Sequence, residues 1–135
     1  MKYMMIIKLA EHSETRRNYE SGAPPVPELL AAITKLREKL TASGAMVETG
    51  GLLPAARGAR IKAAGGRLTV TDGPFIESKE VIGGYAILLA KSKNEAVEMG
   101  AAFMRVHVNI LGPSFEAEME VREMADHAPG CDLGE

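Results

Sequence analysis

The sequence predicts one α+β domain, because two kinds of apolar periodicity alternate along it. Several short segments carry apolar residues at every second position, as strands do, and two longer segments carry them at spacings of three and four, as helices do. The chain has 135 residues, of which 46% are hydrophobic. It therefore has the length of one domain and enough apolar side chains for a core.

The first half starts with a strand and continues into an amphipathic helix. Residues 3–9 are mostly apolar, which favours a strand in the middle of a sheet. Residues 10–27 contain three prolines and no sustained apolar period, so we expect a long loop with one helical turn over residues 14–19. A helix is expected over residues 28–44, with Gly44 at its end. Its apolar stripe consists of Leu29, Ile33, Leu36 and Leu40.

A strand and a hairpin follow the first helix. We expect the strand over residues 45–54, and Gly50-Gly51 within it favours a bulge or a close backbone approach. Polar and apolar residues alternate over residues 59–62 and 67–71, and Gly65-Gly66 between them favours a tight turn. The polar face of this hairpin forms either a solvated edge or an anion site. Its basic residues are Arg60, Lys62 and Arg67.

The second half supplies a strand, a helix and a last strand. Residues 84–90 are apolar on both faces, which predicts a central strand. Ser92 with Glu95 three residues later is a capping box, so a helix is expected to start there and to run to about residue 106. Residues 115–124 alternate between apolar and charged, which predicts a strand with its glutamates in solvent.

The order of these elements is that of a ferredoxin-like α+β domain, with an antiparallel sheet and two helices on one face. Such a layer leaves the second face of the sheet uncovered, and a second copy of the chain could bury it. We expect residues 1–125 to form the domain. We expect residues 126–135, which include Pro129 and Gly130, to be a flexible tail.

Composition narrows the classes of partner. The 16 basic and 18 acidic residues give no electrostatic reason to expect nucleic acid or an anionic membrane surface. The single cysteine, Cys131, cannot form an intrachain disulfide and has no cluster of zinc spacing, which favours the cytoplasm. No stretch approaches the roughly 20 apolar residues that cross a bilayer, so we expect a protein without a membrane partner.

The motif Asp72-Gly73-Pro74-Phe75 carries the main functional hypothesis. Asp72 can accept hydrogen bonds in a turn, Gly73 can take dihedrals closed to other residues, and Pro74 fixes the direction of the chain. In an extended segment Glu77 and Lys79 lie on the same face as Phe75. An acid, a base and an aromatic ring would then project together.

These residues predict a cleft beside Asp72. We take Asp72, Glu77 and Lys79 as catalytic candidates, in which a carboxylate moves a proton and Lys79 stabilises a developing anion. Candidate ligand-binding residues are Lys8, Phe75 and Tyr85. A structural alternative stays open, in which Asp72 caps its turn, Glu77 pairs with Lys79, and Phe75 fills a dimer core.

The block from Thr71 to Tyr85 resembles the DGPF branch of the YCII-related proteins, through Asp72-Gly73-Pro74-Phe75, Glu77-Ser78-Lys79-Glu80 and Gly83-Gly84-Tyr85. The resemblance covers residues 1–124. It implies a small ferredoxin-like subunit that pairs into a dimeric α/β barrel. It also implies a family whose biochemical activity is not established.

The chain departs from its relatives at several positions. In the classical YCII branch, a histidine at the start of the first helix pairs with an aspartate later in the chain. The corresponding segment of this sequence is Pro25-Val26-Pro27-Glu28-Leu29, which contains no histidine. We therefore do not assign this His–Asp pair to the chain. Many members carry an acidic residue at the position of Gly50 and a polar residue at that of Leu53. Of the remaining histidines, His12 is either an exposed loop residue or a base, and His107 is interpreted as a partly buried structural residue.

Two functions remain open on the sequence. The first is a small-molecule-binding protein or a metal-independent acid/base enzyme, with its cleft beside Asp72 and no cofactor. The second is a non-catalytic dimeric module with a regulatory or protein-binding role, which would be linked to transcription. Both predict a homodimer.

Overall fold

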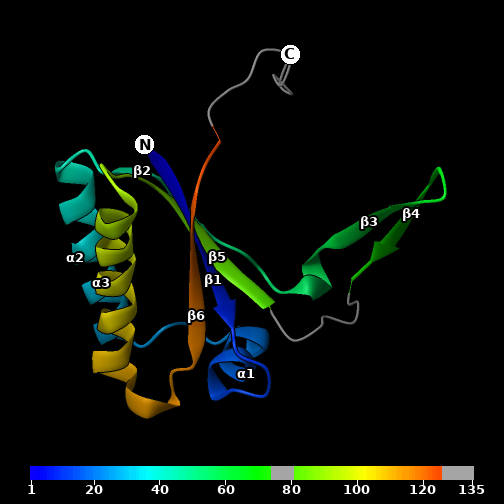
Figure 1. The fold of residues 1–135 in the computed structure, drawn as a ribbon. Helices are drawn as coiled ribbons and strands as arrows, with labels where there is room; N and C mark the ends of the chain where they lie inside the picture. Colours follow the sequence, from blue (N-terminus) through cyan, green and yellow to red (C-terminus); the bar gives the residue numbers. More distant parts are fainter. Residues whose placement is uncertain (74–80, 126–135) are drawn as a thin grey trace.

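The computed structural model describes residues 1–73 and 81–125 (Figure 1). Its centre is a four-stranded antiparallel sheet in the order β2-β5-β1-β6. These strands span Met46–Gly51 (β2), Val81–Leu89 (β5), Lys2–Leu9 (β1) and Ala117–Glu123 (β6). The two most apolar strands, β1 and β5, are therefore the two inner ones, as their sequences predict.

Two long helices cover one face of this sheet (Figure 1). Helix α2 (Pro27–Ala42) connects β1 with β2, and helix α3 (Lys93–Leu111) connects β5 with β6. In each case the connected strands are separated by one other strand, which is the split βαβ arrangement of a ferredoxin-like domain. The fold class predicted from the sequence is confirmed.

The helix ends follow local chemistry. The backbone N–H of Glu95 donates to the Ser92 hydroxyl, which confirms the predicted N-cap of α3. Helix α3 continues to Leu111, five residues beyond the expected end at residue 106, and the 3₁₀ turn η2 (Gly112–Ser114) follows it. Residues 107–111, beyond the expected end of the helix, are therefore helical as well.

A third helix occupies the segment that was expected to be a loop. Helix α1 (Glu14–Ser21) is longer than the single predicted turn. The buried hydroxyl of Ser13 accepts a hydrogen bond from the Arg16 N–H and donates one to the Ala10 carbonyl, so it ties the helix start to the end of β1. Gly22, with φ of 75°, ends the helix in the left-handed conformation.

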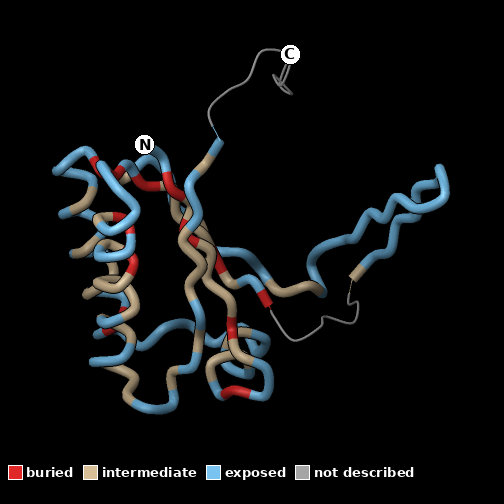
Figure 2. Tube along the Cα trace, in the orientation of Figure 1, coloured by how far each residue is buried: buried red, intermediate tan, exposed pale blue. Residues whose placement is uncertain are grey.

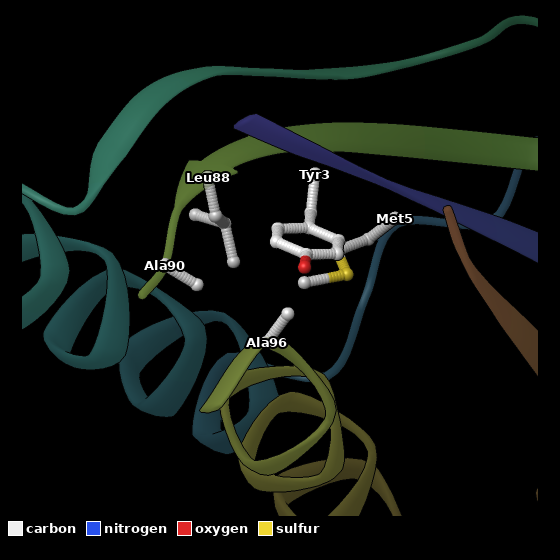
Figure 3. Packing of buried hydrophobic residues seen from close by; sticks show 5 residues of the cluster. All are labelled: Tyr3, Met5, Leu88, Ala90 and Ala96. Atoms are coloured by element: carbon white, nitrogen blue, oxygen red, sulfur yellow. The ribbon is translucent and has the colours of Figure 1, made fainter. Parts of the chain in front are cut away.

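The core lies between α3 and the two inner strands (Figures 2 and 3). Alternate residues of β1 point toward the helices, and Met5 is the largest side chain that is fully buried. Ala96, which is completely buried, lets α3 approach the ring of Tyr3 (Figure 3). The buried cluster consists of Tyr3, Met5, Leu88, Ala90 and Ala96.

The predicted hairpin is present but does not join the main sheet. Strands β3 (Ala59–Ala64) and β4 (Arg67–Asp72) form a separate two-stranded sheet that projects from the body, and we call residues 59–72 the arm (Figure 1). All twelve residues of the two strands are exposed (Figure 2). The register places the three basic residues on one face, as expected, and Ile61, Leu68 and Val70 on the other. Asp72 therefore lies at the base of the arm and not at the end of the four-stranded sheet.

The face of the four-stranded sheet opposite α2 and α3 is here called the open face. Its side chains are those that alternate with the core residues of β1 and β5. The apolar ones are Met4, Ile6, Ile82, Ile87 and Leu89. Glu118 of β6 is exposed on this face, as predicted, whereas Glu120 is engaged in ion pairs.

Among helices α1 to α3, as far as the chain is described, none combines the length and the apolar character needed to cross a bilayer.

Candidate functional site

The motif that dominates the sequence is described only at its start. Asp72 ends β4, opposite Ala59, and is exposed. Within residues 1–73 and 81–125, its carboxylate makes no hydrogen bond or ion pair. Phe75, Glu77 and Lys79 lie outside the described residues, so the grouping of these side chains around Asp72 stays a prediction.

Gly73 is needed for a close backbone approach. Its N–H donates to the Gly58 carbonyl at 2.8 Å, which closes the base of the arm. A Cβ atom at this position would collide with the carbonyl group of Ala55 in the 3₁₀ turn η1 (Ala55–Arg57). The φ of Gly73 lies outside the left-handed region, so the expectation that this residue needs dihedrals reserved for glycine is replaced by a steric reason.

Gly73→Ala is expected to destabilise the protein by about 1–3 kcal/mol, because the backbone of η1 cannot move aside as a flexible side chain would. Chemical denaturation of both proteins measures this difference. Gly58→Ala is a matched control, because the nearest atom to a Cβ there lies at an ordinary 3.7 Å. Equal stability of Gly73→Ala and the wild type would contradict the close approach.

Lys8 is part of an ion pair on the open face. Its Nζ lies 2.7 Å from Oε1 of Glu120, and the side chain is only 18% exposed. Glu120 also accepts a hydrogen bond from Nε of Arg122. Together, the hydrogen bonds from Lys8 and Arg122 lower the pKa of Glu120. A ligand that uses Lys8 would therefore have to compete with a carboxylate already in place.

Tyr85 lies across the open face toward the edge strand. Its hydroxyl donates to Glu48, and this hydrogen bond raises the pKa of the phenol. The ring covers Gly50, where a Cβ would lie 3.0 Å from Cε1 of the tyrosine. Gly50 thus makes room for Tyr85, and Glu48 supplies a carboxylate two residues earlier. Leu53 is 70% exposed.

A cavity of about 970 Å³ lies between the helices and the sheet. The sheet contributes alternate residues of β1, and α2 and α3 contribute their inward faces. Most of the wall is apolar, as in ligand pockets generally. The apolar residues of the wall include Met5, Ile7, Ile33, Leu36, Met99, Phe103 and Met119.

Helix α1 and the segment after it border one end of this cavity. Two side chains hold α1 in place there. The Tyr19 hydroxyl donates to the Leu52 carbonyl at 2.7 Å, after the end of β2. Thr15 Oγ1 donates to the Ser114 carbonyl and accepts from the Glu116 N–H, just before β6. The helix therefore bridges the two edges of the sheet.

His107 is the ionisable side chain of α3 on the cavity wall. Its ring stacks against Phe115 at 4.9 Å between centroids and tilts against Phe103 at 4.6 Å. Nδ1 lies 2.9 Å from the Phe103 carbonyl oxygen. Burial lowers the pKa of His107, and the hydrogen bond to Phe103 offsets only part of that effect. The imidazole is therefore neutral at pH 7.

The structure places the described candidate site residues in two regions, the open face and the base of the arm. Lys8 and Tyr85 share the open face, on neighbouring strands. Of the described candidates Lys8, Asp72 and Tyr85, only Tyr85 is among the residues that border the cavity, and its hydroxyl donates to Glu48 on the open face. The sequence prediction did not include the cavity. The one signal for it was the histidine within the apolar run of α3, which was assigned a structural role, and its burial and backbone hydrogen bond agree with that role.

No group of three or more histidine, cysteine, aspartate or glutamate side chains that could hold a metal ion is found within residues 1–73 and 81–125.

The fold and the cavity together define a class: a small ferredoxin-like α+β domain with a ligand-sized apolar cavity behind its sheet. Residues 1–110 match the family model of the YCII-related domain, so the chain belongs to that family. The match runs from β1 to the last turn of α3. A comparison with curated proteins gives no match.

Proposed function

We propose that this YCII-related protein binds a small apolar molecule in the cavity between its helices and its sheet. The observation that carries the proposal is the cavity itself, whose volume of about 970 Å³ lies at the upper end of the range for small-molecule sites. The space is partly open to solvent, so a ligand can enter it and cover its apolar wall. Empty apolar volume forfeits packing energy, and a bound ligand would recover it.

The lining supports an adaptable site. Four methionines border the cavity, and their unbranched thioethers can adjust to ligands of different outline. They come from both strands and helices. These residues are Met5, Met46, Met99 and Met119.

A thermal-shift screen tests this function. The library should contain neutral apolar compounds and polar metabolites of the same size. A ligand at about 100 times its dissociation constant adds roughly 2.7 kcal/mol to the free energy of unfolding, which raises the melting temperature by several degrees. Stabilisation by apolar compounds alone is the expected result. Stabilisation only by charged metabolites, or by no compound, would contradict the proposal.

Metal-independent acid/base chemistry beside Asp72 is a second candidate, with Glu77 and Lys79 as its further catalytic residues and Phe75 as a wall. The observation in its favour is that the exposed Asp72 carboxylate has no partner within the described ranges, so it is available to a ligand.

Asp72→Asn separates a catalytic role of this residue from a structural one. The catalytic role predicts an unchanged melting temperature together with loss of turnover or of ligand stabilisation for a compound found in the screen. A capping role predicts a loss of about 1 kcal/mol in stability, as for other lost caps. Measuring both quantities on the same preparation decides between the two roles.

We also propose that the protein is a homodimer in which a second copy covers the open face. This face carries partly exposed apolar residues on both inner strands, and the arm adds Ile61, Leu68 and Val70, each at least 64% exposed. Surfaces of this kind mark interaction sites. If the cavity binds no ligand, the same surfaces support the alternative function of a non-catalytic dimeric module that recognises other proteins.

Leu89→Glu is expected to shift the protein from dimer to monomer, because it places a charge in the apolar part of the open face. Val97→Glu on α3 is the matched control, since the two residues are 41% and 46% exposed. Light scattering coupled to size-exclusion chromatography measures the mass. A monomeric wild type, or dimers of both variants, would contradict the proposed interface.

A further inference from the structure

The imidazole of His107 borders the cavity, and ring contacts and a hydrogen bond fix its orientation. The imidazole of His107 is held from two sides by Phe103 and Phe115. Its Nδ1 faces the Phe103 carbonyl oxygen at 2.9 Å. A carbonyl oxygen can only accept a hydrogen bond, so Nδ1 carries the proton. In the neutral ring, Nε2 is then a hydrogen-bond acceptor.

Nε2 of His107 has no hydrogen-bond partner among the described residues, yet the atom is not fully buried. The hydrogen bonds of His107 within residues 1–73 and 81–125 involve Nδ1 alone. In the same ranges no buried side-chain nitrogen or oxygen lacks a partner. Nε2 is therefore accessible, and His107 is one of the residues that border the cavity.

The residues around His107 restrict which ligand groups can bind at its Nε2 atom. His107 itself packs against Phe103 and Phe115, which offer dispersion contacts and no charge; the charged residues on the cavity wall are Glu14 and Arg37, from other helices. A strongly hydrated anion would lose its water there without finding a cation on His107, which is neutral. An apolar molecule with one hydrogen-bond donor is complementary both to the apolar wall and to the acceptor Nε2.

We propose that His107 is the polar anchor of the cavity and that its ligand is an apolar, ring-sized molecule with a hydroxyl or N–H group that donates a hydrogen bond to Nε2. This inference rests on the proposed function, because it names the class of ligand for the same cavity. It assigns His107 a binding role that its position on an apolar helix face does not suggest.

Two matched probes test the anchor. 2-Naphthol carries a hydroxyl donor, and 2-methylnaphthalene has a methyl group of similar size in its place. Affinities of both probes for the wild type and for His107→Phe are measured by calorimetry or intrinsic probe fluorescence. The preference for 2-naphthol is the affinity for 2-naphthol divided by that for 2-methylnaphthalene. This ratio is expected to be about fivefold to tenfold lower in His107→Phe than in the wild type, which is the effect of one neutral hydrogen bond.

His12→Asn is the control variant. The His12 side chain is 89% exposed, and asparagine tolerates the backbone φ of 58° found there. This variant should show the wild-type ratio. Binding of both probes with an unchanged ratio in His107→Phe would overturn the anchor and leave the cavity proposal standing. Binding of neither probe to the wild type would overturn both.

A spectroscopic measurement on the wild type keeps the test independent of how well His107→Phe folds. In ¹⁵N-labelled protein, the Nε2 resonance of His107 should report an unprotonated nitrogen and shift on addition of 2-naphthol, but not on addition of 2-methylnaphthalene. The same shift with both probes, or a protonated Nε2, would overturn the anchor.

Discussion

Leu36→Trp is expected to weaken the binding of apolar probes by at least about fivefold. Leu36 lies in the middle of α2, is half-buried, and borders the cavity. An indole at this position occupies part of the volume that a ligand needs, and displaced or strained contacts cost about 1–3 kcal/mol, equal to roughly fivefold to 150-fold in affinity. Titration with 2-naphthol measures the loss.

The control for this variant comes from the same helix. Leu30 is 51% exposed and does not border the cavity, so Leu30→Trp makes the same chemical change on the outer surface of α2. Its probe affinity should equal that of the wild type. Equal affinity of all three proteins would place the probe elsewhere, and an equal loss in both variants would indicate damage to α2 itself.

Met5→Ala should be the most damaging single truncation of the core, with a loss of about 2–5 kcal/mol in the free energy of unfolding. Met5 is 2% exposed and belongs to the buried cluster between β1 and α3. Its neighbours come from two layers, so they cannot close the space without shifting a helix against the sheet. Urea denaturation measures the difference.

Ile82→Ala serves as the comparison for that truncation, because Ile82 is 46% exposed on the open face of the adjacent strand. Ile82→Ala should lower the free energy of unfolding by less than about 1 kcal/mol at protein concentrations at which the chain is monomeric. Similar costs for the two substitutions would contradict the assignment of the core to the helix side of the sheet.

Elements with a strong local pattern were predictable from the sequence. The two apolar inner strands, the amphipathic stripe of α2 and the Ser92 cap of α3 all depend on residues a few positions apart. The hairpin turn is also local, since Gly65 and Gly66 both take positive φ. Local signals of this kind do not say where an element lies, so the separation of the arm from the main sheet was not predicted.

Helix α1 and the end of α3 were misjudged for a different reason. The α1 segment is polar throughout, so it has no apolar stripe, and its start depends on Ser13, whose hydroxyl bonds within the same turn. The last turns of α3 contain Val106, Val108 and Ile110, which favour strands by propensity. Packing of Phe103 and His107 against Phe115 holds these turns in a helix.

The cavity could not be predicted, because no single segment encodes it. Its walls come from all four strands of the main sheet and from α1, α2 and α3, and the lining residues of α2 and α3 alone form ordinary apolar stripes. Whether two such stripes meet or leave a space depends on the distance between the layers. Sequence motifs therefore directed attention to Asp72, whereas the space for a ligand lies on the helix side of the sheet.

The most direct test of the account is a map of amide chemical-shift changes on addition of 2-naphthol to ¹⁵N-labelled protein. If the probe binds in the cavity, the largest changes occur in α3 around Phe103 and His107 and in the facing part of α2, with the arm unaffected. Changes confined to the open face or to the base of the arm near Asp72 would contradict the account and would favour a cleft at the motif.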